Sequence, residues 1–136
     1  MTIYHLHGDE SGETHMTPVD LTLFDVAATG EGEGSAHRVR VMGRVPAYDL
    51  SASEIVDPLK DTGIHGAPRR QFLVVLQGEY LITTSLGSEV KLKSGDCVFT
   101  DDMGTKGHWS REVGKEPLAL VSVGVPDEAE LPPRVG

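Results

Sequence analysis

The sequence predicts an all-β domain, because short apolar segments alternate with glycine-containing turns along most of its 136 residues. Phe72 to Leu76 is a continuous apolar run that ends just before Gly78. Val90 and Leu92 alternate with lysines, which places the aliphatic side chains inside and the lysines in water. No long stretch shows the period of an amphipathic helix. Short strands at regular spacing are typical of a β-sandwich or β-barrel.

The N-terminal half is predicted to hold two strands joined by a loop. Thr17 to Phe24 and His37 to Val45 each alternate apolar and polar residues, as half-buried strands do. Ala27 to Ser35 between them is rich in glycine and glutamate and has nothing to pack, so it is predicted to be a mobile loop. Its G-x-G-x-G pattern is not a phosphate cradle, because its two glutamates would repel phosphate.

The segment from Ala47 to Gly63 is predicted to contain a short helix. Ser51 and Glu54, three residues apart, match a capping box, and Ile55 begins an apolar pattern. Pro58 would end the helix after one or two turns.

The C-terminal half is predicted to be a run of short strands. They are expected at Phe72–Leu76, Tyr80–Thr84, Val90–Leu92, Cys97–Thr100, His108–Arg111 and Leu118–Val123. No internal repeat or second domain is visible, so residues 1–136 are expected to form one domain. Its parts are an N-terminal arm (1–16), a core barrel (about 17–125) and a C-terminal tail (126–136).

Composition excludes several classes of function. The 12 Lys and Arg against 21 Asp and Glu give a net charge of −9, which disfavours nucleic acid and anionic membranes as partners. The single cysteine, Cys97, cannot form an internal disulfide and is expected to be buried and inert. With no signal-peptide pattern and no apolar stretch of about 20 residues, a cytoplasmic location is expected.

His65 and Gln71 in one segment, and Gly95 and His108 in another, resemble the two sequence motifs of the cupin superfamily. In the first motif, G-x5-H-x-H-x3-4-E-x6-G, His65 stands at the first His and Gln71 at the Glu, while Ala67 replaces the second His. In the second motif, Gly95 is the first glycine and His108 is the histidine.

The chain is similar in particular to small single-domain bacterial cupins. His65 to Gln71 reads H-G-A-P-R-R-Q, and Asp101 to His108 reads D-D-M-G-T-K-G-H, which are patterns typical of that group. The resemblance implies an all-β fold, the cupin double-stranded β-helix or jelly-roll barrel. It implies no settled reaction.

The resemblance also implies a metal site. Cupins commonly hold one divalent transition metal (Fe, Mn, Ni, Zn or Cu) inside the barrel, and the matching residues here are His65, Gln71 and His108. Glutamine in place of glutamate keeps an oxygen ligand but removes its charge. Asp101 or Asp102 could supply that charge from nearby.

A metal-free site would use the same residues differently. His65 and His108 could act as general acid and base near neutral pH, with Asp102 orienting His108. Arg69 and Gln71 could hold a substrate carboxylate at the barrel mouth. This arrangement suits proton abstraction beside a carbonyl, as in isomerisation, cyclisation or elimination.

The same residues could instead have purely structural roles. Arg69 and Arg70 could pair with Asp101 and Asp102 to close the end of the barrel, and Gln71 could be a satisfied core amide. His108, after two glycines, could be a turn residue that faces water.

The histidines near the N-terminus have two interpretations as well. His5 and His7 form an H-x-H pair whose rings would point the same way on a strand, with His15 nearby. This set is either a surface feature or an adventitious metal site.

The sequence therefore favours an enzyme that acts on a small, anionic organic molecule, with catalytic His108, His65 and Asp102 and substrate-binding Arg69 and Gln71. The alternative is a non-catalytic module that binds or senses such a ligand. No nucleotide cofactor is expected, since the sequence has no P-loop. A homodimer formed through edge strands is expected.

Overall fold

The computed structural model describes residues 1–26, 37–57 and 63–133, which form eleven strands and no helix. The strands are β1 (Ile3–Gly8), β2 (Thr14–Pro18), β3 (Thr22–Val26), β4 (His37–Val41), β5 (Leu50–Glu54), β6 (Gln71–Gln77), β7 (Glu79–Thr84), β8 (Glu89–Leu92), β9 (Cys97–Asp101), β10 (His108–Val113) and β11 (Ala119–Gly124). The all-β class predicted from the sequence is confirmed. In the described part of the chain no helix is long and apolar enough to cross a membrane.

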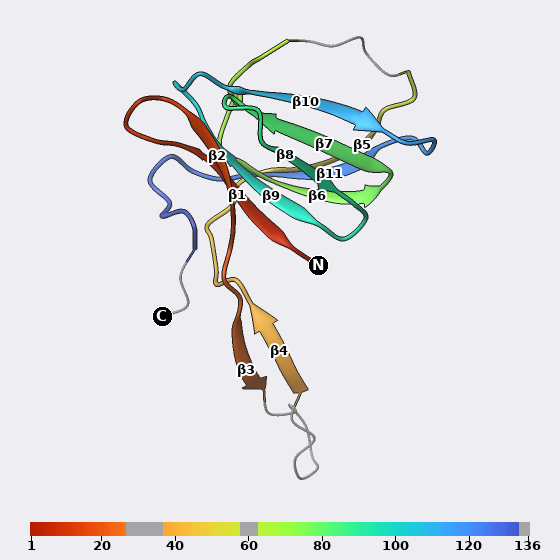
Figure 1. Cartoon of the computed structure of the whole chain (residues 1–136). Helices are drawn as coiled ribbons and strands as arrows, with labels where there is room; N and C mark the ends of the chain where they lie inside the picture. Colours follow the sequence, from red (N-terminus) through yellow and green to blue (C-terminus); the bar gives the residue numbers. More distant parts are fainter. Residues whose placement is uncertain (27–36, 58–62, 134–136) are drawn as a thin grey trace.

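Two sheets form the body of the molecule (Figure 1). The larger has the order β2-β1-β9-β6-β11-β5, and the smaller has the order β10-β7-β8. From β6 onward the chain passes repeatedly between them, because β6, β9 and β11 lie in the larger sheet while β7, β8 and β10 lie in the smaller one. This alternation wraps the chain around one interior, as in a jelly roll.

Each face of the larger sheet packs against a different hydrophobic cluster. The inner cluster contains Leu6, Leu73, Val75, Ile82, Leu92, Val98 and Leu118. The outer cluster contains Ile3, Val19, Cys97, Phe99 and Val125. Because successive side chains of a strand point to opposite faces, β9 contributes Val98 to the inner cluster and Phe99 to the outer one. A strand buried on both faces is apolar at nearly every position, as β9 is.

A separate hairpin, β3–β4, stands out from the body (Figure 1). At its base, Leu21 and Met42 pack against the outer cluster. The strand predicted from Thr17 to Phe24 is therefore divided between β2 and β3, which belong to different sheets. The predicted loop at Ala27–Ser35 lies outside the described residues.

The predicted helix after Ser51 is wrong. Leu50 to Glu54 is a strand, β5, that pairs antiparallel with β11 along its whole length. A capping box offers only local hydrogen bonds, whereas the edge of β11 offers a ladder of backbone partners, so tertiary pairing determines the structure here.

Candidate functional site

His108 and Asp102 form a buried, hydrogen-bonded pair at one end of the interior. His108 is the first residue of β10, and Asp102 directly follows β9. The Nδ1 atom of His108 lies 2.5 Å from Oδ2 of Asp102. His108 is 4% exposed and Asp102 is fully buried. The sequence hypothesis that His108 is a turn residue facing water is wrong.

Backbone contacts hold this pair in place. The other carboxylate oxygen of Asp102 accepts a hydrogen bond from the N–H of Ala67 at 3.0 Å. The backbones of His65 and His108 exchange two hydrogen bonds, of 2.9 and 2.8 Å. Gly107, at φ 82°, permits this approach, because a Cβ there would lie 2.5 Å from the carbonyl carbon of His65.

The carboxylate determines which nitrogen of His108 is reactive. An ionised Asp102 accepts a hydrogen bond from Nδ1–H of His108, which keeps the proton on that nitrogen and leaves the Nε2 lone pair available. Within the described structure Nε2 has no hydrogen-bond partner, although every buried side-chain nitrogen and oxygen atom there has one. Nε2 of His108 therefore keeps a small exposed surface, on a side chain that is 5% exposed.

His65 lies beside the ring of His108. The ring centroids of His65 and His108 are 4.9 Å apart, and the planes are tilted by 49°. His65 is exposed, and its Nδ1 contacts the carbonyl oxygen of Gly63 at 3.1 Å. The structure thus brings together all three predicted catalytic residues, with His65 at the solvent side.

Arg69 and Gln71 form a second polar group. The Arg69 guanidinium donates to Oδ1 of Asp49 at 2.7 Å, to Oγ of Ser122 at 3.2 Å and to Oε1 of Gln71 at 3.3 Å. It also lies over the ring of Tyr48, 5.5 Å from the centroid. The hydrogen bond to Asp49 raises the pKa of Arg69, so this group is a permanent cation.

Ser122 is a site residue that the sequence analysis did not identify. Its hydroxyl donates to Oε1 of Gln71 at 2.8 Å. The available signal was a single polar residue within the apolar strand β11.

The predicted metal ligands include a glutamine whose side-chain oxygen already has two partners. Oε1 of Gln71 already accepts hydrogen bonds from Ser122 and from the Arg69 guanidinium, whose charge would repel a metal ion. No group of three or more His, Cys, Asp or Glu side chains among the described residues is arranged to hold a metal. The metal site at His65, Gln71 and His108 stays a prediction.

Arg70 has the structural role considered for it. Its Nε donates to Oδ1 of Asp101 at 2.7 Å, and its NH1 group donates to the carbonyl oxygens of Pro126, Asp127 and Ala129. An arginine–aspartate ion pair is therefore present as expected, between Arg70 and Asp101, and it fixes the C-terminal segment, whereas Arg69 pairs with Asp49 instead.

The N-terminal histidines lie in a row on the outer face of the larger sheet. The ring centroids of His5 and His7 are 4.6 Å apart, and those of His7 and His15 are 5.8 Å apart. Each Nε2 atom has its own partner: Asp101 for His5, Thr17 for His7 and Asp9 for His15. The rings therefore do not converge on one point.

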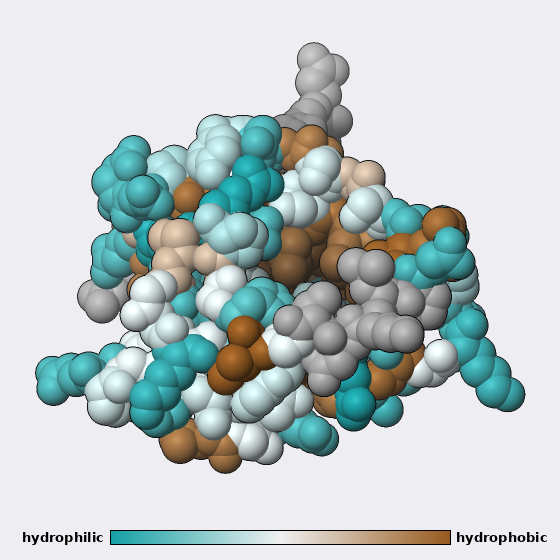
Figure 2. Space-filling view, turned by 90° about the horizontal axis from the view of Figure 1, so that it is seen from above, coloured by the Kyte–Doolittle hydropathy of each residue, from teal (hydrophilic) through white to brown (hydrophobic). Residues whose placement is uncertain are grey.

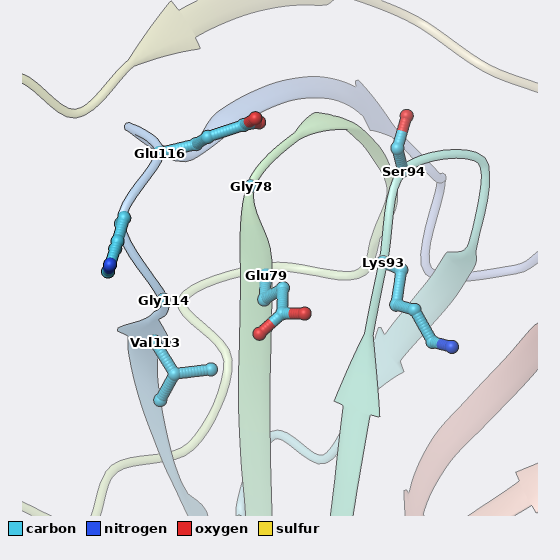
Figure 3. Close-up of a pocket in the computed structure, with 8 residues that line it drawn as sticks. Gly78, Glu79, Lys93, Ser94, Val113, Gly114 and Glu116 are labelled. Carbon is cyan, nitrogen blue, oxygen red and sulfur yellow. The ribbon is translucent and has the colours of Figure 1, made fainter.

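An open pocket of about 360 Å³ lies elsewhere, at the other end of the smaller sheet (Figure 3). Glu79 and Val113 line it, and they face each other across β7 and β10. His108 pairs with Thr84, at the opposite end of the same two strands. This pocket thus lies roughly 17 Å from His108, at 3.4 Å per residue. It contains no oriented pair like that of His108 and Asp102.

Seen from the top of the view in Figure 1, the surface of the molecule has a hollow with hydrophobic residues at its bottom (Figure 2). Hollows with an apolar floor and a few polar groups are typical of small-molecule sites.

No family model matches the chain, and no curated protein matches its sequence. Solved structures similar to it include protein NMB1881 from Neisseria meningitidis, which is 14% identical over 61% of this chain and 84% of the other, with a TM-score of 0.40. Another is the Schizosaccharomyces pombe Cnp3 cupin domain, which is 12% identical over 79% and 85% of the two chains, with a TM-score of 0.40. Similarity at this level does not extend to function, which must be argued from the site.

Proposed function

We propose that this cupin-like protein is an acid–base enzyme that abstracts a proton beside a carbonyl of a small carboxylic acid. The observation that supports this function is the buried contact of 2.5 Å between His108 and Asp102, with Nε2 of His108 left without a hydrogen-bond partner among the described residues. A carboxylate in this position orients the imidazole and stabilises the imidazolium that forms when Nε2 accepts a proton.

The proposed reaction begins with proton transfer from the substrate to His108. Nε2 of His108 takes the proton from the carbon next to the carbonyl, and the electron pair of the broken C–H bond moves to the carbonyl oxygen as an enolate. The imidazolium then returns the proton to the same carbon or to another one, which gives exchange or isomerisation. If the adjacent carbon bears a leaving group, the electron pair expels it and the reaction is an elimination.

Arg69, with Gln71 and Ser122, would hold the substrate carboxylate. The side chain of Asp49, the present partner of Arg69, is 61% exposed, so it can move into water when a substrate carboxylate replaces it. Exposed ion pairs contribute only about 0–1 kcal/mol, so this exchange costs little. A planar guanidinium can then bind the incoming carboxylate through two parallel hydrogen bonds.

Deuterium exchange tests this function without knowledge of the natural substrate. The protein is incubated in D₂O with pyruvate, oxaloacetate, 2-oxoglutarate and acetoacetate in turn, and loss of the C–H signal beside the carbonyl is followed by proton NMR. We expect faster exchange for at least one acid, and a reduction of about 10²–10⁴-fold in His108→Gln. His15→Gln is the matched control, because His15 also pairs with an aspartate but lies on the outer face.

Two outcomes would overturn the proposal. One is equal exchange by the wild type and by His108→Gln. The other is exchange at the protein-free rate for every acid. If an acid bound at Arg69 without exchange, the alternative of a non-catalytic sensing module would be supported.

Metal content separates this chemistry from the metal-assisted alternative. Tag-free protein prepared without chelator is analysed by mass spectrometry, together with His65→Ala and His108→Ala. We expect no stoichiometric metal that depends on these histidines. One metal ion per chain in the wild type, lost in both variants, would contradict this and support the predicted site of His65, Gln71 and His108.

A further inference from the structure

The inner face of the larger sheet is polar along its β11–β5 edge. Leu120 packs against the inner cluster, so Ser53, its pairing partner on β5, faces the interior as well. Because side chains alternate along a strand, Ser122 and its partner Ser51 point to the same side. Ser51 and Ser53 are nevertheless exposed. This part of the interior is therefore open to water.

The outer face of the same two strands is apolar. β11 places Val121 and Val123 there, and β5 places Leu50 and Ala52 opposite them. Antiparallel strands that cover a hydrophobic core show the reverse pattern, with apolar residues inside and polar residues outside. Serines on the inner face are the pattern expected of strands that line a site for a polar ligand.

The edge strand of the smaller sheet adds a second polar row. Tyr80 and Ile82 belong to the inner side of β7, and strand register places Glu112 and Ser110 of β10 directly opposite them. His108 precedes these two residues on the same face of β10. Burial raises the pKa of Tyr80, against an opposing contribution from Ser110, so its hydroxyl stays protonated and can donate a hydrogen bond.

The segment that precedes β6 connects the two rows at one end. The backbone of His65 pairs with His108 on β10, and the guanidinium of Arg69 donates to Ser122 on β11. Glu112 lies four residues further along β10, roughly 14 Å from His108. Among the described residues its carboxylate makes no hydrogen bond or ion pair. A cation therefore lies at one end of the polar rows and an unpaired carboxylate at the other, with hydroxyl groups between them.

We propose that the substrate is a polyhydroxylated acid with a single carboxylate, and that Glu112 selects it against acids that carry a second anionic group. The proposal rests on the proposed function in one respect, the binding of the substrate carboxylate by Arg69. With that end held, the substrate hydroxyl groups lie between serine hydroxyls, which can both donate and accept hydrogen bonds. Glu112 accepts a hydrogen bond from the far hydroxyl group and repels a second carboxylate or a phosphate.

Isothermal titration calorimetry with three six-carbon acids tests the proposal. D-gluconate has one carboxylate and a hydroxyl group on every other carbon, D-glucarate has a second carboxylate at the far end, and hexanoate has no hydroxyl group. We expect gluconate to bind the wild type at least about tenfold more tightly than either of the other acids. Hexanoate leaves the serines without partners, and the second carboxylate of glucarate meets Glu112.

Glu112→Gln separates selection from overall affinity. The amide still reaches the far hydroxyl group but carries no charge, so glucarate should bind this variant at least about tenfold more tightly than it binds the wild type. Gluconate should change by less than about threefold. Glu89→Gln is the matched control, because Glu89 is exposed and pairs with Thr83 on the outer side of the same sheet. It should leave all three affinities unchanged.

Arg69→Gln shows whether the acids occupy the site described, because gluconate binding should be lost in this variant. Gluconate binding that survives in Arg69→Gln would overturn the proposal. So would equal affinity of the wild type for gluconate and glucarate or for gluconate and hexanoate, and so would no binding of any of the three acids. Calorimetry requires no turnover, so a failure of the acid–base function in the deuterium-exchange assay is distinguishable from a failure of this proposal.

Discussion

Asp101 and Asp102 are neighbours in sequence, yet they hold two histidines on opposite faces of the larger sheet. Oδ2 of Asp101 contacts Nε2 of His5 on the outer face at 2.8 Å. Oδ2 of Asp102 contacts Nδ1 of His108 on the inner side at 2.5 Å. The same chemical pair therefore occurs twice, in two different settings, because adjacent residues at the end of a strand point in opposite directions.

The difference between the pairs lies in their other partners. Asp101 also accepts from Arg70, which in turn holds three backbone carbonyl groups of the C-terminal segment. Among the described residues, the carboxylate of Asp102 has only the N–H of Ala67 as a partner besides His108, and the second ring nitrogen of His108 has no partner. An oriented histidine can do chemistry when one nitrogen is fixed and the other is free, whereas the outer pair is part of a network that stabilises the fold.

Among the variants proposed here, Asp102→Asn should have the largest effect, a loss of catalytic deuterium exchange. The amide can still accept from Ala67, but its NH₂ group faces Nδ1 of His108 and favours the wrong tautomer. We expect deuterium exchange to fall by about 10³–10⁴-fold. The free energy of unfolding should change by only about 1 kcal/mol, the size of one altered hydrogen bond. Proton NMR measures the first quantity and urea unfolding the second.

Asp101→Asn is the matched variant on the outer face, and it should show the reverse pattern. It leaves the charge of the buried Arg70 without its carboxylate, so we expect a loss of about 2–3 kcal/mol in the free energy of unfolding. Deuterium exchange per folded molecule should be unchanged, because His108 keeps its partner. A large loss of exchange in Asp101→Asn with little loss of stability would show that the two pairs have been assigned the wrong way round.

The contrast also shows which parts of the site could be predicted from sequence. The pairing of His108 with Asp102 could be predicted, because a short loop joins the two residues and a carboxylate commonly orients an imidazole. The partners of Arg69 were not, because Asp49 and Ser122 are 20 and 53 residues away and reach it only through strand pairing. Strand β5 was mistaken for a helix for the same reason, since its ladder partner is distant in the chain.

The pH dependence of stability should further distinguish the two carboxylates. Burial raises the pKa of Asp101, but hydrogen bonds from His5 and Arg70 outweigh this and hold it below its ordinary value of 3.8. A carboxyl group with a lowered pKa stabilises the fold above its ordinary pKa, and this contribution is lost as the pH falls through the lower value. The stability advantage of the wild type over Asp101→Asn should therefore be constant between about pH 7 and pH 5 and shrink below about pH 4. Urea unfolding at each pH measures this difference, and an advantage that grows as the pH falls would contradict it.

The smallest effect on stability is expected from the titration of His7, which lies between His5 and His15 on the outer face of the larger sheet. Burial lowers its pKa from the ordinary value of 6.5, and the nearby rings of His5 and His15 lower it further, against opposing contributions from Gly8 and Asp101. NMR titration of the imidazole signals, assigned with His7→Gln, should place the midpoint of His7 below 6.5. Since the neutral form is favoured in the folded state, the contribution of His7 to stability is present above pH 6.5 and declines as the pH falls through its lowered pKa.

Two further variants show whether the neighbours of His7 are the cause. His15→Gln removes a cationic neighbour and should raise the midpoint, whereas Asp101→Asn removes an anionic one and should lower it. A midpoint at or above 6.5 in the wild type would mean that the three rings are not packed as a row. The outer histidines would then be free surface groups rather than part of the network around Asp101.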